Sequence, residues 1–215
     1  MSLESTLREE LCRHAKSLFD RGFTVGSSGN ISVRLPDGFL VTPTNSCFGR
    51  LDPARLSKVG PDWGHLSGDK PTKEIPLHRA MLAARPSAGA VVHLHSTYAT
   101  AVSMLDDVDP ADALPPMTPY LIMRVGPLAV VPYARPGAGA VEESIERAGA
   151  SHKAILLANH GPVVADDTLE AAVFAAEELE ESARLFLLTR GLPIRLLSAA
   201  QVQDLVSTFV SPSPR

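Results

Sequence analysis

Two spacings of hydrophobic residues alternate along the chain, one typical of helices and one typical of strands. The helical spacing of three or four residues predicts amphipathic helices at the start of the chain, over 3–18, and near its end, over 169–190. The first is expected to stop before Gly22, and the second to begin in a capping box at Asp167-Thr168-Leu169-Glu170. Shorter helices are expected at 51–56, 73–84, 98–104 and 141–148.

Strands are predicted where hydrophobic and polar residues alternate, or where short apolar runs occur. The segments 31–35 and 39–42, joined by the turn Pro36-Asp37-Gly38, predict a β-hairpin. Further strands are expected at 88–92, 120–123, 128–131 and 154–158, and a turn at 132–137. A length of 215 residues without an internal repeat predicts one domain over residues 1–210, followed by a disordered tail, 211–215.

Histidines stand at the ends of two of these apolar strands. The run Ala88–Val92 leads into His93 and His95, which share one face of a strand because side chains alternate. His160 follows a second apolar run in the same way, and Gly161 after it permits a tight bend. Three imidazoles would leave one position of a zinc ion open for substrate, as catalytic zinc sites do. The alternative is a pair of solvated surface histidines.

Small polar residues and one carboxylate gather at other strand and helix ends. The segment 26–30 could form an anion cradle, in which Asn30 adds an amide donor, or an ordinary turn. Glu74 lies in the first turn of a predicted helix, with Thr72 as its N-cap. It is either a surface carboxylate that complements the helix dipole or one directed into a site, with Thr72 and Lys73 as anion donors. The remaining histidines singled out are expected to be structural: His14, His65 and His78.

Composition and charge exclude several classes of function. Charged residues make up 20% of the chain and sum to −4, with the basic ones spread out, so no nucleic-acid partner is expected. No apolar run approaches the roughly 18 residues of a membrane span, and the first residues do not resemble a signal peptide. Cys12 and Cys47 lie in separate segments and form no CxxC pair, which fits a reducing, cytoplasmic setting.

Five short motifs follow one another along the chain. They are Ser28-Gly29-Asn30-Ile31-Ser32, Thr42-Pro43-Thr44, Lys70-Pro71-Thr72-Lys73-Glu74, His93-Leu94-His95-Ser96 and Asn159-His160-Gly161. In this joint order they resemble the zinc-dependent class II aldolase/adducin family, over nearly the whole chain from Gly26 to Gly191. The segments 51–58 and 66–74 are most similar to its branch of 3-oxo-tetronate 4-phosphate decarboxylases. The aldolase branch typically has a small hydroxyl residue at the position of Lys73.

The resemblance implies a three-layer α/β fold, in which helices flank a central, mostly antiparallel sheet, and a homotetramer with sites between neighbouring subunits. It implies one zinc ion per subunit, bound by His93, His95 and His160. Glu74 matches the acid/base and is a fourth ligand when no substrate is present. Tyr120 falls near a tyrosine that the neighbouring subunit donates. The residues that the resemblance places at the phosphate pocket are Gly29, Asn30, Thr44, Asn45, Thr72 and Lys73.

The implied reaction is zinc-dependent decarboxylation of 3-oxo-tetronate 4-phosphate to dihydroxyacetone phosphate and CO2 through a metal-stabilised enediolate. An aldolase of the fuculose- or ribulose-phosphate type would pass through the same enediolate and is the first alternative. A non-catalytic, adducin-like interaction module is the second, and the intact set of three histidines and Glu74 argues against it. A structural zinc site is disfavoured because four ligands, often cysteines, close such sites.

Overall fold

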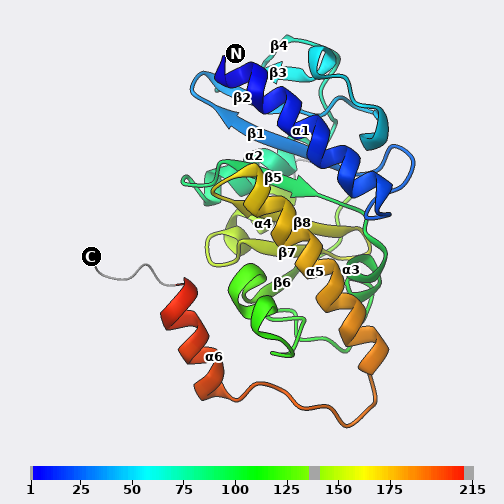
Figure 1. Cartoon of the computed structure of the whole chain (residues 1–215), viewed down its shortest axis with the longest axis vertical. Coiled ribbons are helices and arrows are strands. Elements are labelled where there is room, and N and C mark those ends of the chain that lie inside the picture. The colour runs from blue at the N-terminus through cyan, green and yellow to red at the C-terminus, as the bar shows by residue number, and fades with distance from the viewer. Residues whose placement is uncertain (1, 136–140, 211–215) are drawn as a thin grey trace.

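The computed structural model describes residues 2–135 and 141–210 (Figure 1). Within those residues, eight strands form one sheet in the order β4-β3-β2-β1-β5-β8-β7-β6. Neighbouring strands are antiparallel except β6 and β7, which are parallel, so the prediction of a mostly antiparallel sheet is confirmed. The strands are β1 (Asn30–Leu35), β2 (Gly38–Val41), β3 (Ser57–Val59), β4 (His65–Ser67), β5 (Ala90–His93), β6 (Leu128–Val131), β7 (Ala154–Leu157) and β8 (Gly161–Asp166).

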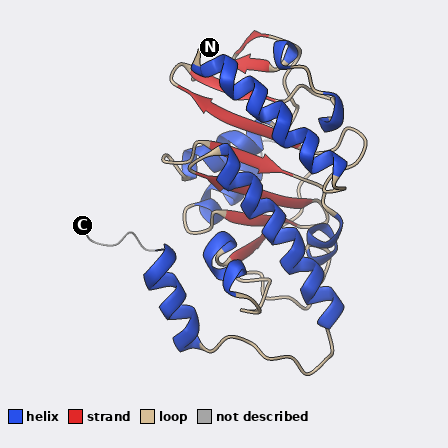
Figure 2. Cartoon of the chain, viewed as in Figure 1, coloured by secondary structure: helices blue, strands red, loops and turns tan. Residues whose placement is uncertain are grey.

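Helices cover both faces of the sheet and complete three layers (Figures 1 and 2). On one face, α1 (Leu3–Asp20), α3 (Thr97–Val102) and α5 (Leu169–Thr189) share a hydrophobic cluster with the strands. On the other face lie α2 (Ile75–Ala84) and α4 (Glu142–Gly149). None of the described helices is long and apolar enough to cross a membrane. The remaining helical segments are η1 (Phe48–Arg50), η2 (Pro53–Arg55), η3 (Leu121–Val125), α6 (Ala199–Leu205) and η5 (Val206–Val210).

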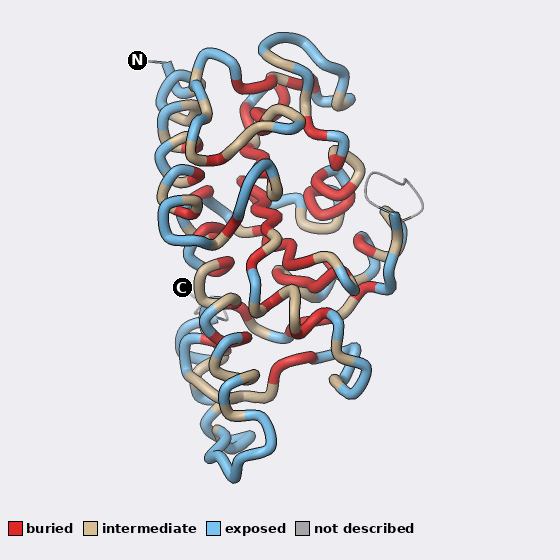
Figure 3. Tube along the Cα trace, turned by 90° about the vertical axis from the view of Figure 1, so that its right-hand side faces the viewer, coloured by how far each residue is buried: buried red, intermediate tan, exposed pale blue. Residues whose placement is uncertain are grey.

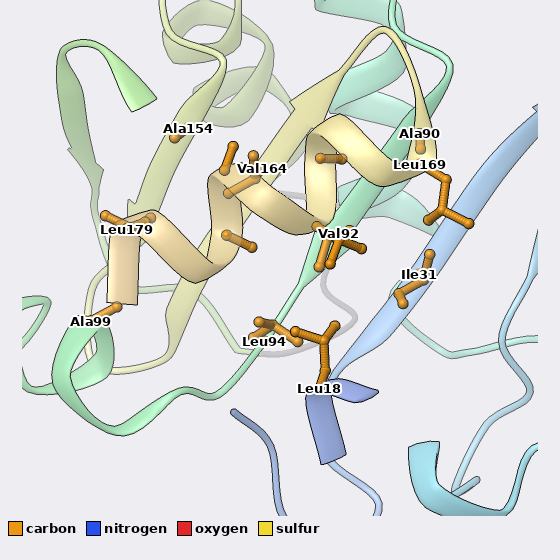
Figure 4. Packing of buried hydrophobic residues seen from close by; sticks show 14 of the residues in the cluster. Leu18, Ile31, Ala90, Val92, Leu94, Ala99, Ala154, Val164, Leu169 and Leu179 are labelled. Atoms are coloured by element: carbon orange, nitrogen blue, oxygen red, sulfur yellow. The ribbon is translucent and has the colours of Figure 1, made fainter. Parts of the chain in front are cut away.

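The central strands are buried on both faces, which explains why they appear in the sequence as apolar runs. Along β5, Val92 belongs to the cluster under α1 and α5, whereas Val91 belongs to the cluster under α2 and α4. Figure 3 shows buried residues following the strands through the middle of the molecule. In Figure 4, α5 lies across β5 and β8, and Leu169 and Leu179 pack against the sheet together with Val92 and Val164. This packing fixes β5 beside β8, and the ends of these two strands carry the candidate site.

The segment 120–123, predicted as a strand, is helical instead. It belongs to the π-helix η3, whose buried positions, Leu121 and Val125, are four residues apart. Thr118 accepts a hydrogen bond from the Leu121 N–H and so satisfies a backbone donor at the start of the helix. Burial at a helical spacing therefore outweighs the strand propensity of this short apolar run.

Two helices begin differently from the prediction. Glu74, not Thr72, is the N-cap residue of α2, and Thr72 Oγ1 accepts a hydrogen bond from the Glu74 N–H. Thr168 caps α5 by accepting the N–H of Ala171, but an alanine there cannot complete the predicted capping box. β8 and α6 were not predicted from the sequence. The predicted turn at 132–137 lies partly, and the predicted tail 211–215 wholly, outside the described residues.

Candidate metal centre and active site

Three histidines meet where β5 and β8 lie side by side. β5 ends at His93, and β8 begins at Gly161, directly after His160; His93 stands opposite Val163 in this antiparallel pair. His95 follows two residues after the end of β5. The Nε2 atoms are 3.2 Å apart between His93 and His95, 3.3 Å between His93 and His160, and 3.1 Å between His95 and His160. The two strand ends thus bring together the three imidazoles that the sequence singled out.

A hydrogen bond to the backbone determines the tautomer of His93, that is, which ring nitrogen carries the proton and which has a free lone pair. His93 Nδ1 lies 2.9 Å from the carbonyl oxygen of Pro162. A carbonyl oxygen only accepts, so Nδ1 carries the proton and donates. In the neutral ring Nε2 is then unprotonated, and its lone pair points toward His95 and His160. This arrangement is typical of histidines that bind a metal ion.

The surroundings also keep the imidazoles neutral. Burial lowers the pKa of His93 well below its usual value, and the nearby His160 and His95 lower it further. Burial likewise lowers the pKa of His95 and of His160. Neutral imidazole is the form that binds metals, so the site is prepared for a cation rather than for protonation.

Glu74 supplies a fourth donor to the same point. Its Oε2 is 3.6 Å from His93 Nε2, its Oε1 is 3.5 Å from His160 Nε2, and one ligand atom from each of the four residues lies within 4.8 Å of the others. Around a tetrahedral zinc ion with bonds of about 2.0 to 2.1 Å, ligand nitrogens lie about 3.3 to 3.4 Å apart. The observed separations of the histidines come within a few tenths of an ångström of that spacing. The donor set therefore fits a divalent metal ion.

His95, His160 and Glu74 line a cavity of about 220 Å³, whereas His93 is fully buried. Two backbone hydrogen bonds, from the Thr44 N–H to the Lys70 carbonyl and from the Thr72 N–H to the Thr42 carbonyl, hold two of its loops together. Gly29 has a φ of +82°, and a Cβ there would lie 3.0 Å from the His93 carbonyl oxygen. All the residues predicted at the phosphate pocket line this cavity: Gly29, Asn30, Thr44, Asn45, Thr72 and Lys73.

Asn30 has a contact that sequence reasoning missed. Its Nδ2 donates to Glu74 Oε2 at 2.7 Å, and its Oδ1 lies 2.5 Å from Nε2 of His78. The side chain of His78 was expected only to pack, and it is fully buried. The spacings that could have revealed the connection are Glu74 to His78, one helical turn apart, and Asn30 to Ser32, two residues apart on one strand.

Glu180 of α5 is a second group that the sequence did not reveal. Its two carboxylate oxygens accept the N–H groups of Tyr98 and Ala99, each at 2.8 Å, at the start of α3. Ser96, the N-cap residue of α3, would ordinarily accept one of these donors. Its hydroxyl is instead buried with no hydrogen-bond partner in the described part of the chain. Glu180 thus anchors the helix that follows His95.

Of the predicted site residues Lys73 and Tyr120, the structure of the single chain places only Lys73 at the cavity. Lys73 lines the cavity beside Glu74. Tyr120 is 56% exposed and is not among the residues that line the cavity within the described chain. Its predicted contribution to the site of a neighbouring subunit stays a prediction.

Comparison with known proteins identifies the family. The chain is 48% identical over 206 residues to 3-oxo-tetronate 4-phosphate decarboxylase of Escherichia coli K12, covering 95% of this chain and 97% of that one. It is 33% identical over 192 residues to L-fuculose phosphate aldolase of the same organism, covering 87% and 86%. The crystal structure of YgbL from Escherichia coli superposes with a TM-score of 0.92 at 47% identity, covering 95% of this chain and 99% of that one. Residues 9–187 match the model of the class II aldolase and adducin N-terminal domain, and the chain belongs to this family.

Proposed function

We propose that this protein is a metal-dependent carboxy-lyase that converts 3-oxo-tetronate 4-phosphate to dihydroxyacetone phosphate and CO2. The observation that carries the proposal is the convergence of three imidazoles and Glu74 on one point in the wall of a cavity that Lys73 also lines. The identity of 48% to proteins named for this decarboxylation supports the choice of reaction.

The proposed metal ion is zinc, one per subunit, with His93, His95 and His160 as ligands and Glu74 as a fourth when the substrate is absent. Bound there, zinc would act as a Lewis acid toward the C3 ketone oxygen of the substrate. The Pro162 carbonyl fixes the ring of His93 so that its Nε2 lone pair is presented without reorientation. Once Glu74 gives way to substrate, three nitrogen ligands with one open position remain, which is the arrangement of catalytic zinc sites.

The cavity residues are proposed to hold the two anionic ends of the substrate. The phosphate would be surrounded by residues from the loops that line the cavity: Gly29, Thr44, Asn45 and Thr72. Asn30 lies at the inner end of the cavity. Lys73 would bind the C1 carboxylate or the phosphate through its ammonium group. In either position it would orient the substrate beside Glu74.

The bond changes then follow from the chemistry of a 3-oxo acid. The C1–C2 bond breaks, CO2 leaves, and the electron pair remains on C2, delocalised toward the C3 oxygen. A proton delivered to C2 completes dihydroxyacetone phosphate. Glu74 is the proposed donor because its carboxyl group borders the cavity; it would take up a proton from solvent once the substrate displaces it from the metal, and Tyr120 of a neighbouring subunit is the other candidate.

The proposal extends to assembly and location. We expect a homotetramer with sites between neighbouring subunits, and the exposed Tyr120 side chain on each subunit is available for such a contact. Cys12 and Cys47 are both free thiols, which fits a reducing cytoplasm.

The decisive experiment supplies 3-oxo-tetronate 4-phosphate and follows dihydroxyacetone phosphate in a coupled assay, together with CO2 release, before and after chelation. We expect product from the zinc-loaded protein, loss of activity on chelation and recovery on adding zinc back. A Glu74→Gln variant that retains zinc and full activity would remove Glu74 from the mechanism. No product from the zinc-loaded protein would refute the proposed substrate.

A second candidate activity, aldol cleavage of a sugar phosphate, is favoured by the identity of 33% to L-fuculose phosphate aldolase. It predicts release of an aldehyde with dihydroxyacetone phosphate from a fuculose- or ribulose-type phosphate, and no CO2 from the 3-oxo acid. Metal analysis separates both enzymes from an adducin-like interaction module, for which no tightly bound metal is expected.

A further inference from the structure

Four buried side chains form a continuous hydrogen-bonded chain that ends at Glu74. Ser32 Oγ lies 2.8 Å from His78 Nδ1, His78 Nε2 lies 2.5 Å from Asn30 Oδ1, and Asn30 Nδ2 lies 2.7 Å from Glu74 Oε2. The exposed fraction of these residues is 0% for Ser32 and His78, 4% for Asn30 and 6% for Glu74. Solvent therefore has little access to any of these hydrogen bonds.

The geometry of one strand and one helix brings these four residues together. Asn30 and Ser32 are two residues apart on β1, so their side chains leave the same face of the strand. His78 lies on α2, which packs on that face, and its two ring nitrogens contact one residue each. Glu74 is the N-cap residue of the same helix, one turn earlier. The strand β1 and the helix α2 thus supply all four of the hydrogen-bonded side chains.

The direction of each hydrogen bond follows from what each group can donate. An ionised carboxylate only accepts, so the amide nitrogen of Asn30 must face Glu74 and its oxygen must face His78. The amide oxygen also only accepts, so His78 Nε2 must carry the proton. His78 Nδ1 is then an acceptor and takes its hydrogen bond from the Ser32 hydroxyl. Burial lowers the pKa of His78 to about 3, which keeps the ring neutral and so able to accept at Nδ1.

We infer that His78 is a positioning residue for the candidate active site: it fixes the orientation of the Asn30 amide, which in turn holds the Glu74 carboxylate against the three histidines. This inference rests on the proposed function for its link to catalysis, and its structural part concerns the metal site alone. Without a donor at the position of His78 Nε2, the Asn30 amide can rotate and direct its oxygen at Glu74. The carboxylate would then lose its tether and face a second acceptor.

The geometry gives the tether a specific effect on Glu74. Oε2 is held between Asn30 and His93, so Oε1 is left facing His160 at 3.5 Å. Rotation of the carboxylate would move both oxygens with respect to the histidine nitrogens. Partners that orient a metal ligand typically contribute 10- to 100-fold to metal affinity or activity. We expect a loss of about this size when His78 can no longer donate.

The experiment compares His78→Leu, which removes the donor, with His78→Gln, whose amide nitrogen can reach the position of Nε2. We expect His78→Leu to bind zinc about 10- to 100-fold more weakly in competition with a chromophoric chelator, and to lower kcat more than it raises KM. His78→Gln should recover most of both. Met81→Ala is the matched control, because Met81 lies on the same helix but faces Gly149 of α4; it should reduce thermal stability without reducing zinc affinity.

A measurement on the unmodified protein keeps the inference testable if a variant fails to fold. Nitrogen-15 NMR of the histidine rings should find His78 protonated at Nε2 and not at Nδ1, in the presence and absence of zinc. Protonation at Nδ1, or wild-type zinc affinity in a folded His78→Leu variant, would overturn the inference. Neither readout needs substrate, so a failure of the proposed reaction would be recognised separately from a failure of the positioning role.

Discussion

Replacing Gly161 with alanine should separate the two strand ends that carry the histidines. Gly161 directly follows His160, has a φ of +152°, and lies against the backbone between the other two histidines. A Cβ at this position would lie 2.4 Å from the carbonyl oxygen of Leu94 and 3.4 Å from the Cα of His95. The clash is with backbone, so a rotation of a side chain cannot relieve it. Either the start of β8 or the segment after β5 must move.

The size of that movement can be compared with what a metal site tolerates. To reach an acceptable separation, the new Cβ must retreat from the Leu94 oxygen by about 0.6 to 1.0 Å, whereas ligand distances in a working metal site vary by only about 0.2 Å. The left-handed φ adds about 1 to 3 kcal/mol of backbone strain for a residue with a Cβ. We therefore expect Gly161→Ala to weaken zinc binding by about 10- to 100-fold or more. This is the loss that is typical when a residue that orients a metal ligand is replaced.

The assay is zinc affinity by competition with a chromophoric chelator, paired with thermal unfolding of the metal-free protein. Gly191→Ala is the control, because Gly191 has a φ of +79° but nothing lies within 4 Å of its added Cβ. It should lower stability through strain and leave zinc affinity unchanged. A folded Gly161→Ala protein with wild-type zinc affinity would show that the contact with Leu94 does not set the geometry of the site.

Three further substitutions or conditions test the surrounding structure. Glu180→Gln should lower the free energy of unfolding in urea by about 1 to 2 kcal/mol. The reason is that the single amide oxygen replaces two carboxylate oxygens, which accept the Tyr98 and Ala99 N–H groups. An unchanged urea midpoint would show that Glu180 does not stabilise the start of α3. Lys73→Ser should raise KM for the 3-oxo acid about 10-fold or more, since a charge-assisted contact is worth roughly 1.5 to 3 kcal/mol, and should leave zinc content unchanged; an unchanged KM would remove Lys73 from substrate binding. Because burial lowers the pKa of His78 to about 3, the unfolded chain takes up a proton near pH 6.5 that the folded chain does not. The contribution of His78 to the free energy of unfolding should therefore be complete above about pH 6.5 and fall by about 1.4 kcal/mol per pH unit below it. Urea unfolding of the metal-free wild type and of His78→Gln, measured from pH 7 to 5, should show that the free energy of unfolding falls less steeply with decreasing pH in the variant. The same pH dependence in both proteins would contradict the lowered pKa of His78.

The sequence singled out His93, His95 and His160 because both histidine segments end apolar runs that are typical of buried strands, and the structure brings the three side chains together. The sequence could not show that the runs pair. A strand beginning at Gly161 was not predicted, and Pro162 does not favour one, since proline is depleted inside sheets. In the structure β8 begins at Gly161 and passes through this proline, whose carbonyl accepts from His93. The residue that obscured the strand therefore also fixes the orientation of a candidate ligand.

Elsewhere, local pattern and tertiary context disagree for identifiable reasons. The run Tyr120–Met123 has strand-like composition, and only the burial of Leu121 and Val125 together shows that it is helical. The helix α6 did have a signal, because Ser198 and Gln201 form the capping box that its sequence spacing permits. The spacing of His78 from Glu74 permits a connection but does not establish it, since a buried histidine on an apolar helix face has the same pattern whether it only packs or also holds Asn30.

The distribution of the site over the fold suggests which properties can change independently. The three histidines lie on or directly beside the adjacent central strands β5 and β8, and β1 on the other side of β5 carries Asn30, which holds Glu74 at the start of α2. Lys73 and Asn45, in contrast, lie on loops outside the strands. Loops tolerate substitution better than buried strands that are covered on both faces. Under the proposed function, substitutions in these loops would change the substrate while the strands keep the histidines in place, which is consistent with relatives named both as a decarboxylase and as an aldolase.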